Sequence, residues 1–269
     1  MKLRFWKMHG AGNDFILADD RAGKFPVADK GWITRISTRR TGIGCEGVIL
    51  IQKSKKADFR MRFFNPDGGE ADMCGNGARC IARLAYEIGA APAEMSIETG
   101  AGMLKAEVSG DTVRIHMTKP KDWRIDKTLM IKKKCVKYSF VNSGVPHVVV
   151  EVPDLQSVDV ESMGAAIRYH ADLAPAGTNA NFISVTGPQS LSIRTYERGV
   201  EAETLACGTG MVASALISGK LGLVKAPVAV TCASGDVLEI GYELTESGAR
   251  NVTLRGSAVH VFNGTVEYC

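Results

Sequence analysis

Apolar residues recur along this chain with two different spacings, and the two spacings alternate twice. Most apolar positions fall in short stretches typical of strands, but two longer stretches have helical spacing. In the first, apolar residues recur at three- and four-residue intervals from Ala78 to Ile88, and Gly89 supplies a stop. In the second, residues 211–217 are apolar nearly all round, and the stretch ends near Gly222. A helix without a polar face is usually central and buried, so we predict a central helix in each half of the chain.

Short strand patterns flank each predicted helix in the same order. Strands, a helix and strands again, repeated once, predict an α+β fold with two pseudo-symmetric lobes. The segment 119–128 breaks the pattern. We therefore divide the chain into lobes at 1–120 and 121–269, with a last strand that is able to pair back with the first lobe. The expected strands are 3–8, 13–17, 48–51, 59–63, 94–98, 102–109 and 112–117, then 138–141, 148–152, one opening at 178–182, 191–196, 228–232, 237–240, 252–254 and 258–262, with further helices at 29–40 and 159–170.

A cysteine stands just before each predicted central helix. The first loop reads Asn65-Pro-Asp-Gly-Gly-Glu70-Ala-Asp-Met-Cys74-Gly-Asn-Gly-Ala-Arg79, and the second reads Arg198-Gly-Val-Glu-Ala-Glu203-Thr-Leu-Ala-Cys207-Gly-Thr-Gly210. In both loops the cysteine precedes Gly-x-Gly, and a glutamate lies four residues before the cysteine. About half of the 269-residue chain separates the two cysteines. A duplicated domain that carries one cysteine per copy is the simplest account.

The start of a helix changes the chemistry of a cysteine placed there. Unpaired backbone N–H groups and the helix dipole favour negative charge, and the same field lowers a thiol pKa from its usual value of about 8.5. The glycines let a ligand approach the backbone, so a carboxylate could bind the same N–H groups. If the halves face each other, Cys74 and Cys207 provide a base and an acid of one chemical type. That pair suits a reversible reaction that removes a proton from one face of a carbon and returns one to the other. The alternative is that both are buried structural cysteines.

Composition and charge narrow the classes of protein. Hydrophobic residues make up 45% and charged residues 23% of the chain, which is ordinary for a soluble globular protein. The net charge is +4, and the dense basic run at 132–137 has no interleaved aromatic residues, so we expect no nucleic-acid partner. No apolar run approaches the length of a membrane span. The seven cysteines show no Cys-x-x-Cys and no zinc spacing, which predicts no metal. The chain opens without an apolar signal core, and a thiol pair needs reducing conditions, so we expect a cytoplasmic location.

Several motifs spread along the chain together resemble the diaminopimelate epimerase family. They are Asn65 to Arg79, Glu197-Arg198-Gly199, Thr204 to Gly210, His9 to Phe15, Pro146-His147 and Asn179-Ala-Asn181-Phe182. The resemblance implies a pyridoxal-independent isomerase with no cofactor, which interconverts LL- and meso-diaminopimelate for lysine and peptidoglycan synthesis. It also implies a homodimer, and two lobes that are each a β-barrel-like sheet wrapped around a central helix, with the substrate in the cleft between them.

The resemblance implies a role for individual residues as well. Cys74 and Cys207 match the two acid–base residues, and His147 and Glu197 match the polar partners that hold the thiols in reactive states. The reacting carboxylate would bind at the two helix starts, at Gly75, Asn76, Gly208 and Thr209. The distal amino acid end would be held by Asn13, Asn65, Asn179 and Arg198, of which the arginine is a planar donor suited to bidentate carboxylate binding. We expect Glu70 and Glu203 only to cap their loops. The histidines His116, His170 and His260 are expected to be structural or exposed, and the remaining cysteines are expected to be inert: Cys45, Cys80, Cys135, Cys232 and Cys269.

The chain departs from the family pattern at three places. Gly42-Ile-Gly-Cys45-Glu46 replaces the usual Gly-x-Gly-x-Asp, Val145 stands where many relatives carry asparagine, and the segment 198–207 is one residue longer. None of these changes touches the thiols, but the missing asparagine removes a substrate contact and leaves the strictness for diaminopimelate open. The alternatives are a proline or hydroxyproline racemase, which shares the two-cysteine logic, a non-catalytic amino acid binding protein, and a redox-sensing thiol protein.

Overall fold

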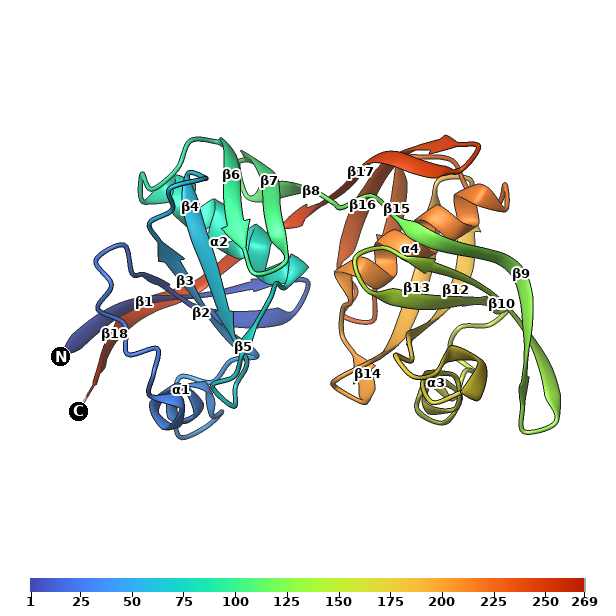
Figure 1. Cartoon of the computed structure of the whole chain (residues 1–269), viewed down its shortest axis with the longest axis horizontal. Helices are drawn as coiled ribbons and strands as arrows, with labels where there is room; N and C mark the ends of the chain where they lie inside the picture. The colour runs from blue at the N-terminus through green and yellow to red at the C-terminus, as the bar shows by residue number, and fades with distance from the viewer. Residues whose placement is uncertain (269) are drawn as a thin grey trace. The chain divides into compact units, whose positions relative to one another are not determined.

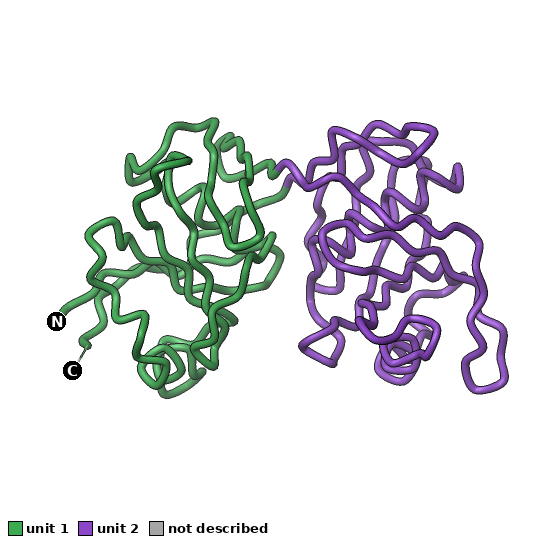
Figure 2. Tube along the Cα trace, viewed as in Figure 1, with its two compact units in different colours: residues 1–115, 256–269 green, residues 116–255 purple. Residues whose placement is uncertain are grey.

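The computed structural model describes residues 1–268, which form two compact units (Figure 2). Unit 1 holds residues 1–115 and the described residues from 256 onwards, and unit 2 holds residues 116–255. The chain therefore leaves unit 1 once and returns to it for its last strand. The lobes inferred from the sequence, 1–120 and 121–269, stay a prediction about the extent of the duplicated halves. Cys269 lies outside the described residues.

Unit 1 is a twisted sheet that surrounds the helix α2 (Gly75–Glu87) (Figure 1). Strand β1 pairs antiparallel with both β2 and β18. From β2 the pairing continues parallel to β3, antiparallel to β4, parallel to β6 and antiparallel to β7. The elements of unit 1 are β1 (Lys2–Gly10), β2 (Asn13–Asp19), α1 (Lys30–Ser37), β3 (Gly47–Gln52), β4 (Phe59–Phe64), β5 (Glu70–Ala71), α2, β6 (Glu94–Thr99), β7 (Gly102–Ser109), β8 (Thr112–His116) and β18 (Val259–Glu267).

Unit 2 repeats this plan around the helix α4 (Gly208–Lys220). Strand β10 pairs antiparallel with β9 and β11, and the pairing continues parallel to β12, antiparallel to β13, parallel to β15 and antiparallel to β16. The same alternation of parallel and antiparallel pairs confirms that the fold is duplicated. The elements of unit 2 are β9 (Lys121–Ile131), β10 (Lys134–Asn142), β11 (Pro146–Glu151), α3 (Val160–Arg168), η1 (Ala171–Leu173), β12 (Asn179–Gly187), β13 (Ser190–Glu197), β14 (Ala202–Thr204), α4, β15 (Val228–Thr231), β16 (Val237–Thr245) and β17 (Gly248–Ser257).

The two central helices begin and end as their sequences predict. Each ends near a glycine with positive φ, Gly89 at 66° and Gly222 at 76°, a conformation that costs other residues more. Helix α4 is buried over nearly all of its length, in agreement with its lack of a polar face, whereas α2 exposes its last turn. Burial of these apolar side chains is the main force that holds each sheet around its helix.

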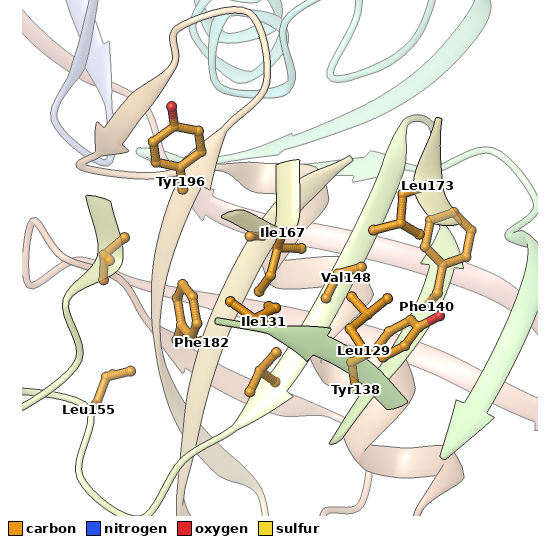
Figure 3. Close-up of a cluster of buried hydrophobic side chains, with 13 residues drawn as sticks. Leu129, Ile131, Tyr138, Phe140, Val148, Leu155, Ile167, Leu173, Phe182 and Tyr196 are labelled. Carbon is orange, nitrogen blue, oxygen red and sulfur yellow. The ribbon is translucent and has the colours of Figure 1, made fainter. Parts of the chain in front are cut away.

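A second helix packs on each sheet through its own apolar cluster. In unit 1, Trp32 and Ile33 of α1 contribute to a cluster that includes Leu50 of β3. In unit 2, Ile167 of α3 lies among side chains of the sheet such as Phe182 (Figure 3). Both helices start at an aspartate whose carboxylate caps a backbone N–H, at 2.9 Å in α1 and 3.0 Å in α3. The predicted helices at 29–40 and 159–170 are therefore confirmed, with shorter bounds.

Two expectations from the sequence are wrong. The segment 119–128 is not a break, because β9 runs through it and pairs with β10. Most side chains of β9 are exposed, so the strand has no apolar alternation for a pattern to detect. The strand expected at 148–152 begins two residues earlier, because Pro146 and His147 open β11. No helix within residues 1–268 combines the length and the apolar character needed to cross a membrane.

Candidate active site

Both cysteines lie at the N-cap of the central helix of their unit, as the sequence predicts. The backbone of Cys74 is extended, with φ −134° and ψ 124°, and its carbonyl accepts the N–H of Ala78 at 2.8 Å. Cys207 has φ −117° and ψ 103°, and its carbonyl accepts the N–H of Met211 at 3.0 Å. The thiols therefore stand where free backbone N–H groups and the helix dipole favour a negative charge.

An arginine–glutamate pair holds the loop before each cysteine. Arg62 of β4 donates to both carboxylate oxygens of Glu70 at 2.8 and 2.7 Å, and Arg194 of β13 donates to both of Glu203 at 2.7 Å. The hydrogen bond from Arg62 lowers the pKa of Glu70 below its usual value. Neither glutamate is a capping residue of its helix, and each ties the loop back to the strand that leads into it. This fixes the loop by charge-assisted bidentate contact.

Polar side chains from β2 and α2 meet around Cys74. Its Sγ donates to Oδ1 of Asn13 at 3.6 Å, and Asn76 Nδ2 donates to the same oxygen at 3.3 Å. Asn13 Nδ2 donates in turn to the carboxylate of Glu46, the residue that departs from the family pattern. The predicted residues Asn13 and Asn76 therefore do lie beside this thiol. Asn65 lies in the exposed turn after β4, where its carbonyl accepts the N–H of Gly68 at 2.9 Å.

A different set of residues meets around Cys207. Its Sγ lies 3.6 Å from Oγ1 of Thr209, which lies 2.9 Å from Nε2 of His147. Nδ1 of His147 lies 3.1 Å from Nδ2 of Asn181, and Oδ1 of Asn181 accepts the hydroxyl of Thr195 at 3.0 Å. Burial, followed by the positive charge of Arg198, lowers the pKa of His147 to about 3. The imidazole is therefore neutral at physiological pH.

Sequence reasoning placed neither Asn181 nor Thr195 in the site. Both are buried polar residues on strands that also carry buried apolar residues, such as Ile183 of β12 and Ile193 of β13. A buried polar side chain among apolar neighbours is costly unless it has partners, and that is the signal that could have found Asn181.

The remaining predicted residues form a separate group at the ends of β12 and β13. Asn179 accepts the backbone N–H of Arg198 at 2.8 Å and donates to the carbonyl of Pro146 at 2.9 Å. Nη1 of Arg198 donates to the carbonyl of Ala176 at 2.9 Å. Glu197 accepts the hydroxyl of Thr204 at 2.9 Å. Within unit 2 these contacts place Glu197 and Arg198 near the start of the Cys207 loop.

Solved structures with the same two-unit plan define the class of fold. The chain aligns over all of its length with a PhzF-family phenazine biosynthesis protein of Bacillus anthracis, with a TM-score of 0.75 and 16% identity, and it covers all of that protein. It also aligns over 98% of its length with a hydroxyproline epimerase of Agrobacterium vitis, covering 92% of it with a TM-score of 0.70 and 18% identity. The chain thus has the duplicated α+β fold of these proteins.

The family within that class follows from the sequence comparisons. The model of the diaminopimelate epimerase family matches residues 5–123 and 139–261. The diaminopimelate epimerase of Aquifex aeolicus is 43% identical over 277 residues, which cover 98% of both chains. That of Chlorobaculum tepidum is 44% identical over 264 residues, which cover 96% of this chain and 99% of the relative. The chain belongs to the diaminopimelate epimerase family.

Proposed function

We propose that this protein is a cofactor-independent isomerase that interconverts LL- and meso-diaminopimelate. The observation that carries the proposal is the matched pair of cysteines, each at the N-cap of a buried helix in one of two duplicated units. Two groups of the same chemical type can exchange the roles of acid and base, as a reaction that runs in both directions requires. Family membership supports the substrate, since the relatives named above are diaminopimelate epimerases.

In the proposed reaction the two sulfurs act on opposite faces of one carbon. A thiolate takes the proton from Cα, and the electron pair of the broken C–H bond moves towards the carboxylate. The thiol on the other face then gives its proton to Cα, so that the product has inverted configuration and the two sulfurs have exchanged protonation states. Proton transfer requires each sulfur to approach the carbon to about 3–3.5 Å.

The developing charge needs stabilisation because the α-proton is weakly acidic. We propose that the backbone N–H groups at the helix starts, at Gly75, Asn76, Gly208 and Thr209, bind the reacting carboxylate. Preorganised N–H groups in a site closed to water stabilise such charge strongly. We propose that His147 and Glu197 tune the thiols.

The other end of the substrate carries a second amino acid group. We propose that Asn13, Asn65, Asn179 and Arg198 bind it. The backbone of Arg198 is fixed by Asn179, and its guanidinium is suited to a carboxylate. Because Asn179 already binds the carbonyl of Pro146, the turn that carries Val145 is coupled to this group. Substrate range is therefore expected to respond to Val145→Asn.

The test compares single cysteine variants. Cys74→Ala and Cys207→Ala should each lower epimerisation of diaminopimelate by at least about 10²–10⁴-fold, because one of two proton-transfer groups is lost. The matched control is Cys135→Ala, which changes an exposed free cysteine on β10 and should keep full turnover. Turnover is measured by deuterium uptake at Cα in D₂O.

Two outcomes would contradict the proposal. Near-normal turnover in either active-site variant would exclude the two-thiol mechanism. Deuterium uptake by proline or hydroxyproline instead of diaminopimelate would identify the alternative racemase, and binding of diaminopimelate without any exchange would identify a binding protein.

We also propose that the enzyme works in the cytoplasm and as a homodimer. The chemistry supports the first, because Cys74 and Cys207 must both stay reduced. Family resemblance supports the second. Cell fractionation and sedimentation velocity test these two statements separately.

A further inference from the structure

The strand registers allow the two units to be compared residue by residue beneath the helix starts. In unit 1, Phe15 of β2 pairs with the first residue of β3, and Ile49, two residues further along, pairs with Phe63 of β4. In unit 2, His147 of β11 pairs with the first residue of β12, and Asn181, two residues further along, pairs with Thr195 of β13. The three residues in unit 2 therefore occupy the positions of Phe15, Ile49 and Phe63 in unit 1.

The contacts of the helices confirm this equivalence independently. The third residue of α2 is Gly77, and a Cβ there would come within 2.5 Å of Ile49 Cδ1. The third residue of α4 is Gly210, and a Cβ there would come within 2.4 Å of Asn181 Oδ1. Ile49 and Asn181 thus lie under the same turn of their helices.

The equivalent positions have opposite chemistry. In unit 1 they are buried and apolar, and Phe15 and Phe63 meet edge to face with ring centroids 6.2 Å apart. In unit 2 the side chains of His147, Asn181 and Thr195 are buried to 97% or more and are joined by hydrogen bonds. A buried polar cluster where the sister unit has an apolar core needs an explanation beyond packing.

The hydrogen bonds of this cluster have a single consistent direction. Val148 O can only accept, so the atom of Asn181 that lies 2.7 Å from it is the amide nitrogen Nδ2. The same Nδ2 therefore donates to Nδ1 of His147 at 3.1 Å, while the other end of the amide accepts from Thr195. A neutral imidazole that accepts at Nδ1 carries its proton on Nε2, which donates to Oγ1 of Thr209. The hydroxyl of Thr209 then has its own proton to donate to Cys207 Sγ.

The contact at Cys74 has the opposite direction. Glu46 accepts from Nδ2 of Asn13, which turns Oδ1 of the amide towards the sulfur. A carbonyl oxygen can only accept, so Cys74 must be the donor and carry its proton.

We propose that Asn181 and Thr195 are positioning residues that fix the tautomer of His147, so that Thr209 donates to Cys207 and makes it the resting thiolate while Cys74 keeps the proton. This inference rests on the proposed function, and it assigns the roles of the two thiols in the unliganded enzyme. Cys207 then removes the proton from whichever stereoisomer presents its α-hydrogen to unit 2, and Cys74 donates from the other face.

We call the hydrogen-bonded series from Asn181 through His147 and Thr209 to Cys207 the relay. The charges around the relay are compatible with this assignment. Burial first, and then the positive charge of Arg198, lowers the pKa of His147 and keeps the imidazole neutral. The thiol of Cys207 also lies at the positive end of α4, which favours its thiolate. Helix α2 offers Cys74 the same field, whereas the hydrogen bonds described above differ in direction between the two thiols.

The test follows the alkylation of each thiol by iodoacetamide as a function of pH, with peptides quantified by mass spectrometry. The midpoint of each profile reports the pKa of that thiol and does not depend on turnover. In the wild type, the midpoint of Cys207 should lie at least about one pH unit below that of Cys74. Thr195→Val and Asn181→Leu should raise the midpoint of Cys207 by about one unit and leave that of Cys74 unchanged.

Matched variants separate positioning from loss of structure. Thr195→Ser retains the hydroxyl and should restore the wild-type midpoint. Ile49→Val alters the equivalent position of unit 1 without a polar group and should move neither midpoint. Thermal unfolding checks that each variant is folded, and if Asn181→Leu fails to fold, the comparison of Thr195→Val with Thr195→Ser still decides.

The proposal is overturned if Cys74 has the lower midpoint, or if Thr195→Val leaves the midpoint of Cys207 where it was. Failure of the proposed function is a different result. In that case the cysteine variants would retain turnover, whatever the alkylation profiles show.

Discussion

The starts of the two central helices are alike in what holds the cysteine loop and unlike in what lies beneath it. In both units a bidentate arginine–glutamate pair fixes the loop, and a cysteine caps a buried helix. Beneath α2 lie Phe15 and Ile49, whereas beneath α4 lie His147 and Asn181. Duplication gave the two thiols equivalent positions at the start of a helix. Divergence in the layer below gave them different hydrogen-bond partners, which we propose make their pKa values unequal.

This comparison shows which parts of a duplicated site are under common constraint. The loop and the helix start position each sulfur, and both units have the same arginine–glutamate pair and the same N-cap cysteine there. The layer below packs under the third residue of each helix, where one copy has an ordinary apolar core and the other has a hydrogen-bonded polar cluster.

The largest difference between the two units is expected when the third residue of each central helix, a glycine, is replaced by alanine. Gly210→Ala should destabilise unit 2 by about 3 kcal/mol and abolish most activity, because the Cβ would meet Oδ1 of Asn181, which is held by its own hydrogen bonds. Gly77→Ala should cost about 1 kcal/mol, because the facing atom is the flexible end of Ile49. Urea denaturation compares the two variants. Equal losses would show that the polar layer is no more rigid than the apolar one.

Lowering the pH is expected to have a smaller effect on the free energy of unfolding. It should destabilise the polar layer beneath α4, which contains His147, and leave the apolar layer beneath α2 unchanged. The folded pKa of His147 is lowered to about 3 from 6.5, so its contribution to stability is present above pH 6.5 and is lost as the pH falls towards 3. Between pH 7 and pH 5 the loss should be about 2 kcal/mol. Phe15, at the equivalent position, has no proton to gain.

The measurement compares the wild type with His147→Gln, which does not titrate in this range. The free energy of unfolding of the wild type should fall relative to that of the variant between pH 7 and pH 5. Parallel pH dependence in the two proteins would mean that the pKa of His147 is the same in the folded and the unfolded chain.

The smallest predicted difference concerns the two arginines that hold the loops. Arg194→Ala should cost about 1–2 kcal/mol, because Arg194 also donates to the carbonyls of Leu155 and Val158 at 3.0 Å each. Arg62→Ala should cost about 0.5–1 kcal/mol, because its partner Glu70 is partly exposed and solvent screens the pair. Thermal unfolding ranks the two variants. The reverse order would assign the loop of unit 1 the greater dependence on its ion pair.

Much of this architecture could be predicted from the sequence, because helices with apolar faces and glycine stops leave a periodic signal. The central helices, their cysteines and most strands follow from that signal. Strand β9 does not, because its exposed side chains leave no alternation, and β5 at two residues is too short to show any.

The candidate site was predictable only in part, for a physical reason. Asn13, Asn76, His147 and Thr209 are found beside the thiols, and resemblance to a family had pointed to them. The part played by Asn181 depends on the register between strands that are far apart in the chain, and no local pattern encodes a register. The roles of Asn65 and Arg198 in binding substrate, and of Glu197 as a polar partner that tunes a thiol, stay predictions.

Strand β18 gives the molecule an order of assembly. It is the partner of β1, and the N-terminal amine of Met1 donates to the carbonyl of Tyr268 at 2.7 Å. Unit 2 is one continuous stretch of chain, whereas unit 1 is assembled from two. Unit 2 therefore needs no residue beyond 255, whereas β1 finds its β18 partner only when nearly the whole of this stretch of chain has been made.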